Sequence, residues 1–372
     1  MLITRPPMGW NSWNTFGTNI SEDLIKETAD AIVETGLADA GYNYVVIDDC
    51  WSLRERGEDG RIVPDPEKFP SGMKALADYV HSKGLKFGMY SCDGPLTCAG
   101  YPASFDHEFI DAKTFADWGV DYLKYDNCYK PDLPGRVLYN RMSMALKASG
   151  RDIVFSACNW GSEEVHKWIR STGAHLYRST GDINDSFGSF RDLAVSQMDL
   201  QGYNAPGCFN DIDMLITGMY GKGNVAVSGC TDEEYLMHFA LWCYFASPLM
   251  IGCDVRNMTD ATLATLKNKE LIRINQDAEA RSPFLIQNEE GRYSFLKHLE
   301  NGEYAIAYIN FDDAAATVNA EFANFGLHDT TGFAFDLTDV ITGEKFKNVT
   351  GALNFELGAH SFRILRGRIH AK

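Results

Sequence analysis

This 372-residue sequence lacks the short motifs that mark several common chemistries. It contains no CxxC pair, which argues against a zinc ribbon or a thioredoxin-type site. Its nine histidines form neither an HExxH nor an HxH motif. No glycine fingerprint follows the first predicted strand, so a dinucleotide-binding fold is disfavoured. We therefore expect neither a metal nor a cofactor.

Positive charge is also scarce in this sequence. Lysine and arginine number 34 against 51 acidic residues, which gives a formal net charge of -17. Without a basic stripe to offset phosphate repulsion, we expect no nucleic-acid and no membrane partner. A neutral small molecule is compatible with this charge.

The N-terminal segment, residues 1–7, has no apolar h-region. We expect neither a signal peptide nor a transmembrane span, and hence a cytoplasmic protein. A secreted protein whose leader had been removed would look the same. The nine cysteines leave at least one thiol unpaired in a monomer, and most lie in apolar or small-residue surroundings that are typical of buried, inert thiols. A homo-oligomer is compatible with the sequence.

Eight short apolar runs alternate with amphipathic stretches up to about residue 278. Most runs are continuously apolar, as expected for parallel strands covered on both faces. Between them, residues 24–40 repeat apolar side chains at helical spacing behind Ser21, a suitable N-cap, and a later stretch ends before Gly84, a suitable C-cap. Eight strand–helix units predict a (β/α)8 TIM barrel over residues 1–278. The predicted strands are Met8–Trp10, Asn43–Asp49, Lys86–Ser91, Tyr122–Asp126, Ile153–Cys158, Leu176–Thr180, Phe209–Leu215 and Pro248–Gly252.

Two segments depart from this rhythm. Residues 54–73 are charged and rich in glycine and proline, which predicts a long loop or a small hairpin on the upper face of the barrel. After residue 278, alternating aromatic runs are separated by Asn-Gly, Asp-Asp and Thr-Gly turns. This pattern predicts a C-terminal antiparallel β-sandwich domain over residues 279–372.

The most informative segment is Tyr122–Cys128, an aromatic-rich run that ends in a carboxylate. Side chains alternate along a strand, so Lys124 and Asp126 point the same way. A neighbouring cation lowers the pKa of a carboxyl group and keeps it ionised, as a nucleophile requires. The alternative is a structural salt bridge at the end of the strand.

The ends of the other predicted strands are also polar, and in a barrel these ends share one face. They carry carboxylates, indoles and an arginine, a combination that suits a sugar: carboxylates bind hydroxyls, and a pyranose ring packs on indole. Each residue also has a structural reading, but their gathering at one edge favours the functional one. The residues concerned are Trp10–Trp13, Asp48, Asp49, Tyr90, Lys124, Asp126, Cys158–Trp160, Arg178, Asp182, Asp211 and Asp213.

Two carboxylates with different roles would complete a glycosidase. Asp126 is the candidate nucleophile. Asp182, on a predicted loop, would protonate the leaving oxygen and later deprotonate water. Retention of configuration needs the two groups about 5–5.5 Å apart and inversion ~6.5–9.5 Å, a choice that the sequence leaves open.

Five motifs make the chain resemble glycoside hydrolase family 27, the family of α-galactosidases and α-N-acetylgalactosaminidases. The resemblance runs in order along essentially the whole chain. It implies a (β/α)8 barrel with a C-terminal β domain, and a retaining α-galactosidase that acts by double displacement through a galactosyl-aspartate intermediate. The motifs are Met8–Asn14, Ile47–Trp51, Tyr122–Cys128, Asn210–Leu215 and Ile274–Asp277.

The resemblance also implies a role for each site residue. Asp126 matches the nucleophile and Asp182 the acid/base. Asp48 and Asp49 match the pair that binds the 4- and 6-hydroxyls of galactose. The remaining matches are Lys124 (3- and 4-hydroxyls), Arg178 and Asp213 (ring contacts), Trp13 (stacking indole), Tyr90 and Met214 (pocket lining), and a disulfide between Cys98 and Cys128.

Other family activities remain as alternatives. Cys158 and Trp160 resemble galactosidases in which bulk fills the space near the sugar 2-position, so an N-acetyl group should clash. Asp48 and Asp49, suited to the 4- and 6-hydroxyls, argue against a β-L-arabinopyranosidase as the main activity. A non-catalytic galactose-binding protein is disfavoured by the two carboxylates, and a metal-dependent barrel hydrolase by the lack of ligands.

Several positions depart from the family pattern. Thr18 stands where many relatives have a cysteine that pairs with the counterpart of Cys50, so Cys50 is expected to be a free thiol. Asn159 replaces a common acid, and Cys92 and Phe209 replace commoner residues. The natural aglycone, whether a raffinose-type oligosaccharide, galactomannan, glycolipid or glycan, depends on loops 54–73 and 221–231.

Overall fold

The computed structural model describes residues 1–198, 200–289 and 291–372. Eight parallel strands form one sheet in the order β10-β8-β7-β6-β5-β2-β1-β12. Leu215, just after β10, joins the two ends of the sheet, since its N–H donates to the carbonyl of Met250 and its carbonyl accepts from the N–H of Gly252. The sheet therefore closes into the predicted barrel. The strands are β1 (Met8–Asn11), β2 (Tyr44–Val46), β5 (Lys86–Cys92), β6 (Tyr122–Asp126), β7 (Val154–Ala157), β8 (Leu176–Arg178), β10 (Phe209–Asp211) and β12 (Leu249–Ile251).

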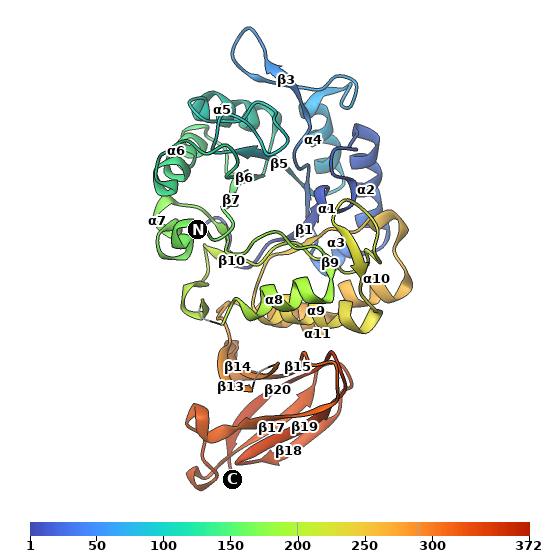
Figure 1. Ribbon diagram of the computed structural model, residues 1–372, viewed down its shortest axis with the longest axis vertical. Helices are drawn as coiled ribbons and strands as arrows, with labels where there is room; N and C mark the ends of the chain where they lie inside the picture. The colour runs from blue at the N-terminus through green and yellow to red at the C-terminus, as the bar shows by residue number, and fades with distance from the viewer. Residues whose placement is uncertain (199, 290) are drawn as a thin grey trace.

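Helices surround this ring of strands (Figure 1). The hydroxyl of Ser21 accepts from the N–H of Leu24 at 3.2 Å, which confirms the predicted N-cap. The single helical stretch predicted up to Ala40 is two helices, because the chain turns at Gly36 with φ 75°. The helices are α1 (Trp13–Phe16), α2 (Glu22–Glu34), α3 (Leu37–Ala40), α4 (Gly72–Ser82), α5 (Glu108–Trp118), α6 (Gly135–Ala148), α7 (Ile169–Thr172), α8 (Phe187–Val195), α9 (Asp232–Tyr244), α10 (Asp260–Leu266) and α11 (Lys269–Asn275).

Two segments above the barrel carry short sheets of their own. Strands β3 (Ser52–Arg56) and β4 (Ile62–Pro64) pair antiparallel, so the hairpin alternative for residues 54–73 is confirmed; it projects away from the ring in Figure 1. Strands β9 (Asp185–Ser186) and β11 (Ala226–Gly229) form a second, parallel pair.

The seventh predicted strand is shorter than expected. It ends at Asp211 rather than Leu215, because Asp213 has a φ of 83°, outside the extended region. The prediction was wrong here because a run of apolar residues does not reveal a left-handed turn.

The C-terminal residues form an antiparallel domain with two sheets. One has the order β13-β14-β15-β20-β17-β18, and β16 pairs with β19. An apolar core that includes Tyr308, Phe322 and Phe335 lies between the two sheets, which confirms the predicted sandwich. Its strands are β13 (Phe284–Glu289), β14 (Arg292–His298), β15 (Glu303–Asn310), β16 (Ala316–Glu321), β17 (Phe333–Asp339), β18 (Lys345–Val349), β19 (Ala352–Leu357) and β20 (Ser361–Ala371).

The sandwich packs against the side of the barrel where α8, α9 and α11 lie (Figure 1). The buried hydroxyl of Tyr244 donates to the carbonyl of Ala305 at 2.8 Å, and the ammonium of Lys297 donates to the carbonyl of Tyr244 at 2.8 Å. The barrel core continues into Phe295 and Ile364 of the sandwich. Because one apolar core spans both the barrel and the sandwich, packing does not mark a boundary between them. The predicted domain division at residue 278 stays a prediction. Within the described residues, no helix is both long and apolar enough to span a lipid bilayer.

Candidate active site

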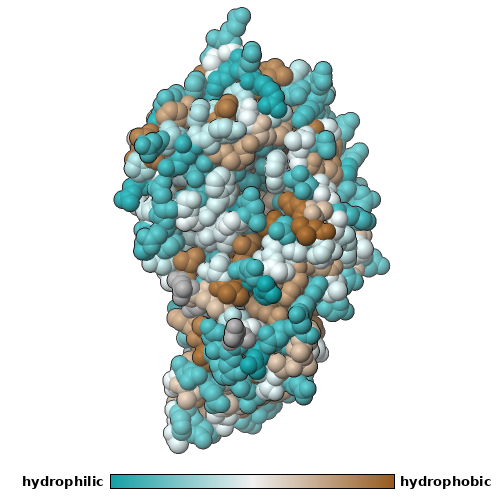
Figure 2. All heavy atoms as spheres, viewed as in Figure 1, coloured by the Kyte–Doolittle hydropathy of each residue, from teal (hydrophilic) through white to brown (hydrophobic). Residues whose placement is uncertain are grey.

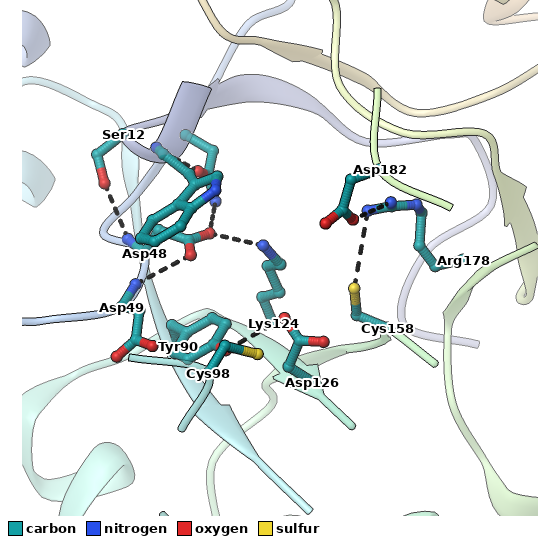
Figure 3. A network of polar contacts seen from close by, with 12 residues as sticks. Ser12, Asp48, Asp49, Tyr90, Cys98, Lys124, Asp126, Cys158, Arg178 and Asp182 are labelled. Atoms are coloured by element: carbon teal, nitrogen blue, oxygen red, sulfur yellow. Dashed lines mark hydrogen bonds and ion pairs between the residues drawn. The ribbon is translucent and has the colours of Figure 1, made fainter. Parts of the chain in front are cut away.

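The carboxyl ends of the barrel strands surround one pocket, whose empty space is about 540 Å³ when the open solvent at its mouth is included. The face shown in Figure 2 is hollowed over the middle of the barrel. Polar and aromatic side chains from most of the strand ends point into this pocket, as the close view in Figure 3 shows. The lining residues are Trp13, Asn14, Asp48, Asp49, Tyr90, Cys98, Lys124, Asp126, Trp160, Arg178, Asp182, Ile183, Asp213, Met214 and Val225.

Asp126 is held by regular structure at the end of β6. It is only 5% exposed, and its two oxygens accept from different donors. Oδ1 accepts from the N–H of Asn127 at 3.0 Å, and Oδ2 lies 3.1 Å from the hydroxyl of Tyr90 on the neighbouring strand β5. The carboxylate is therefore fixed in position before any substrate binds.

Lys124 points to the same face as Asp126, as strand alternation predicts, but its ion pair is with another acid. Its ammonium lies 2.8 Å from Oδ2 of Asp48. Burial raises the pKa of Asp126 to about 6, and the opposing charge of Lys124 only limits this rise. Lys124 lowers the pKa of Asp126, as expected from the sequence, but desolvation of the buried carboxylate outweighs this one cation and the net shift is upward.

Asp182 has the opposite environment. It lies on the loop between β8 and β9, and its side chain is 75% exposed. Its Oδ1 lies 2.6 Å from Nη2 of Arg178. Partial burial acts to raise the pKa of Asp182, but the charge and the hydrogen bond of Arg178 outweigh it, and the pKa is lowered.

Arg178 joins the acid/base candidate to the turn that follows β10. Its Nη1 lies 2.8 Å from Oδ1 of Asp213, whose Oδ2 accepts from the N–H of Ile183 at 2.7 Å. Nη1 also lies 3.7 Å from the sulfur of Cys158. Cys158 is buried and is absent from the pocket lining, so its thiol supports Arg178 from below.

Asp48 and Asp49 are also pre-positioned. Asp48 accepts from the side-chain amide of Asn11 at 2.8 Å. Asp49 accepts from the backbone N–H groups of Cys50 at 2.7 Å and Ala99 at 2.9 Å. Burial raises the pKa of Asp49 despite these hydrogen bonds.

A disulfide lies beside the nucleophile candidate. Cys98 and Cys128 are bonded, as the family resemblance implied, with their Cα atoms 5.1 Å apart. Both sulfurs lie close to a carboxylate oxygen of Asp126, a spacing that would suit a shared metal ion. The sulfurs are bonded to each other, so this group offers no pair of thiolates to a cation. Cys50 is a free, buried thiol, as expected from Thr18.

Eleven of the twelve predicted catalytic and substrate-binding residues line the pocket, Cys158 being the exception. Asn14, Ile183 and Val225 line it without having been predicted. Asn14 and Ile183 adjoin predicted residues, so proximity in sequence was an available signal. Val225 reaches the pocket from the loop between β10 and β11, within residues 221–231 that were expected to shape the aglycone site, although no single residue of that loop was predicted. Asn159 is buried outside the lining and donates to the carbonyl of Ser162.

A TIM barrel that brings two carboxylates, aromatic walls and hydroxyl-binding acids to one pocket has the architecture of a glycoside hydrolase. Comparison with known proteins agrees. Residues 5–277 match the family model described as alpha galactosidase A, and residues 291–366 match that of the alpha galactosidase C-terminal beta sandwich domain. The chain belongs to the α-galactosidase family, glycoside hydrolase family 27.

Individual relatives cover almost all of the chain. An α-galactosidase from Cyamopsis tetragonoloba is 42% identical over 364 residues, which are 98% of this chain and 86% of that protein. Alpha-galactosidase A from Cellvibrio japonicus is 41% identical, with coverage of 98% and 92%. The crystal structure of α-galactosidase I from Mortierella vinacea superposes with a TM-score of 0.92 at 34% identity, covering 98% of this chain and 97% of that one.

Proposed function

We propose that this protein is a retaining α-galactosidase that hydrolyses terminal, non-reducing α-D-galactosyl residues. One observation carries the proposal. A buried carboxylate, Asp126, and an exposed one, Asp182, line the same pocket, together with hydroxyl-binding acids that are already oriented.

In the first step, Asp126 attacks the anomeric carbon while Asp182 protonates the leaving oxygen. The hydrogen bonds from Asn127 and Tyr90 aim the nucleophile, and its 5% exposure keeps water away from it. Arg178, bound to both Asp182 and Asp213, must loosen its hold on Asp182 for that carboxyl to carry a proton.

In the second step, Asp182 acts as a base and removes a proton from water, which then attacks the galactosyl–Asp126 ester. The high exposure of Asp182 suits this role, because water reaches it directly. Two displacements at one carbon retain its configuration.

The remaining lining residues select the sugar. Asp48, which pairs with Lys124, and Asp49 together would bind the 4- and 6-hydroxyls. Trp13 offers a stacking face, and Trp160 limits the space near the 2-position, with Met214 completing the wall. Cys158 would act at the 2-position only through Arg178.

The direct test compares 4-nitrophenyl α-D-galactopyranoside with 4-nitrophenyl N-acetyl-α-D-galactosaminide and 4-nitrophenyl β-L-arabinopyranoside. We expect the galactoside to be the best substrate by more than about tenfold in kcat/KM, since one clash or one lost hydroxyl contact costs at least that much. Proton NMR should show α-galactose as the first product. Equal rates on the N-acetyl sugar, β-galactose formed first, or tight binding without product would each contradict the proposal.

Raffinose, a galactomannan oligosaccharide and a galactosyl lipid, scored by released galactose, would then define the aglycone. A cytoplasmic location and self-association remain predictions. Fractionation of the native host and light scattering of the purified protein test them.

A further inference from the structure

Three residues beyond Asp182, a second aspartate is completely buried. Asp185 has 0% exposure and is absent from the pocket lining, so substrate does not reach it. Its Oδ1 accepts from the hydroxyl of Tyr235 at 2.8 Å, and its Oδ2 accepts from the N–H of Gly221 at 2.6 Å. Both carboxylate oxygens are thus used to hold the chain that carries the acid/base.

The hydroxyl of Tyr235 is the centre of this cluster. Besides donating to Asp185, it accepts from the N–H of Tyr220 at 2.6 Å and from the N–H of Cys230 at 3.3 Å. Burial raises the pKa of this phenol, so it keeps the proton that it donates. One hydroxyl therefore joins three segments, namely the Asp182 loop, the loop after β10 and the approach to helix α9.

The same segments reach the rim of the pocket. The N–H of Asp185 donates to the carbonyl of Val225 at 2.9 Å, and Val225 in turn donates to the carbonyl of Asn14 at 3.1 Å. Both Val225 and Asn14 line the pocket. On the inner side, the N–H of Ile183 donates to Asp213. The exposed Asp182 therefore lies between two anchors, one inside the pocket and one outside it.

From this arrangement we propose that Asp185 and Tyr235 are positioning residues that set the reach of Asp182 for proton transfer. The inference rests on the proposed function. General acid catalysis depends on distances near hydrogen-bond length, so a small displacement of this loop lowers the rate of protonation. Neither residue touches the substrate.

The test exploits the leaving group. When the leaving group is a sugar hydroxyl, as in raffinose, its departure requires protonation by Asp182. The 2,4-dinitrophenolate anion leaves without being protonated. For Tyr235→Phe we expect kcat/KM on raffinose to fall about tenfold or more, and kcat/KM on 2,4-dinitrophenyl α-galactoside to stay within about twofold of wild type. Asp185→Asn, which keeps the shape of the side chain, should show the same selective loss if Tyr235→Phe folds poorly.

Tyr42→Phe is the matched control. Tyr42 is equally buried, and its hydroxyl donates to the carbonyl of Leu266 at 2.8 Å, but it precedes β2 at the opposite end of the barrel. Tyr42→Phe should leave kcat/KM unchanged on both raffinose and 2,4-dinitrophenyl α-galactoside, even if the variant melts at a lower temperature. Equal losses on both substrates in Tyr235→Phe and Asp185→Asn, or no loss on either, would overturn the proposal. An inactive wild type would instead refute the α-galactosidase assignment.

Discussion

The two catalytic carboxylates proposed here are held in different ways. Asp126 ends a barrel strand, is buried, and accepts from its own strand end and from the adjacent strand. Asp182 is exposed on a loop whose position depends on Arg178, Asp213 and the buried pair Asp185 and Tyr235. Regular structure therefore fixes the group that forms a covalent bond, and long-range side-chain contacts fix the group that moves protons.

Removing the nucleophile should have the largest effect. Asp126→Asn preserves the size of the side chain but leaves an amide that does not attack the anomeric carbon. We expect kcat on every α-galactoside to fall by at least about 10⁴-fold, whatever the leaving group. Asp121→Asn is the control, because Asp121 precedes the same strand and pairs with Arg151 away from the pocket. A residual rate above about 1% in Asp126→Asn would contradict the assignment.

Removing the acid/base should produce a loss that depends on the leaving group. Asp182→Asn should lower kcat/KM on raffinose by about 10²–10⁴-fold, the usual contribution of general acid catalysis. On 2,4-dinitrophenyl α-galactoside, kcat/KM should change little, and added azide should raise kcat by replacing the water that Asp182 activates. Asp192→Asn, an exposed aspartate on α8, makes the same chemical change outside the pocket. If Asp182→Asn lowered kcat/KM by the same factor on both substrates, Asp182 would not be the general acid.

The sequence predicted the Asp126 side of the site more completely than the Asp182 side. Alternation placed Lys124 and Asp126 on one face, and the barrel rule brought the strand ends together. The anchors on either side of Asp182 join residues far apart in sequence, 30 residues for Ile183 and Asp213 and 50 for Asp185 and Tyr235, and their meeting depends on loop geometry. The raised pKa of Asp126 was also missed, because it depends on burial rather than on neighbours in sequence.

The disulfide cross-links the part of the site that contains Asp126 and not the loop that carries Asp182. Cys98 and Cys128 follow strands β5 and β6 and are separated by 30 residues. A cross-link closing a loop of this length should contribute about 3.6 kcal/mol to the free energy of unfolding. Cys98→Ala with Cys128→Ala should lose this amount in urea denaturation and respond no further to reductant. Cys208→Ala, which removes a free buried thiol, should keep the wild-type response to reductant. An unchanged free energy of unfolding in the double variant would show that the bond is absent in solution.

The smallest effect, and the most discriminating one, concerns pH. In the free enzyme the pKa of Asp126 is raised to about 6, whereas that of Asp182 is lowered. A substrate whose leaving group departs without protonation needs only an ionised Asp126. For 2,4-dinitrophenyl α-galactoside, kcat/KM should therefore fall about tenfold per pH unit below about pH 6 and stay level above it. Raffinose also needs a protonated Asp182. Its kcat/KM should therefore be level just below pH 6 and fall about tenfold per unit above it, since both groups are then ionised. With the pKa values in this order, the acid limb of the dinitrophenyl substrate and the alkaline limb of raffinose should meet at the same pH, about 6. Because kcat/KM reports the free enzyme, an acid limb that lies well below the alkaline limb would show that Asp126 ionises before Asp182.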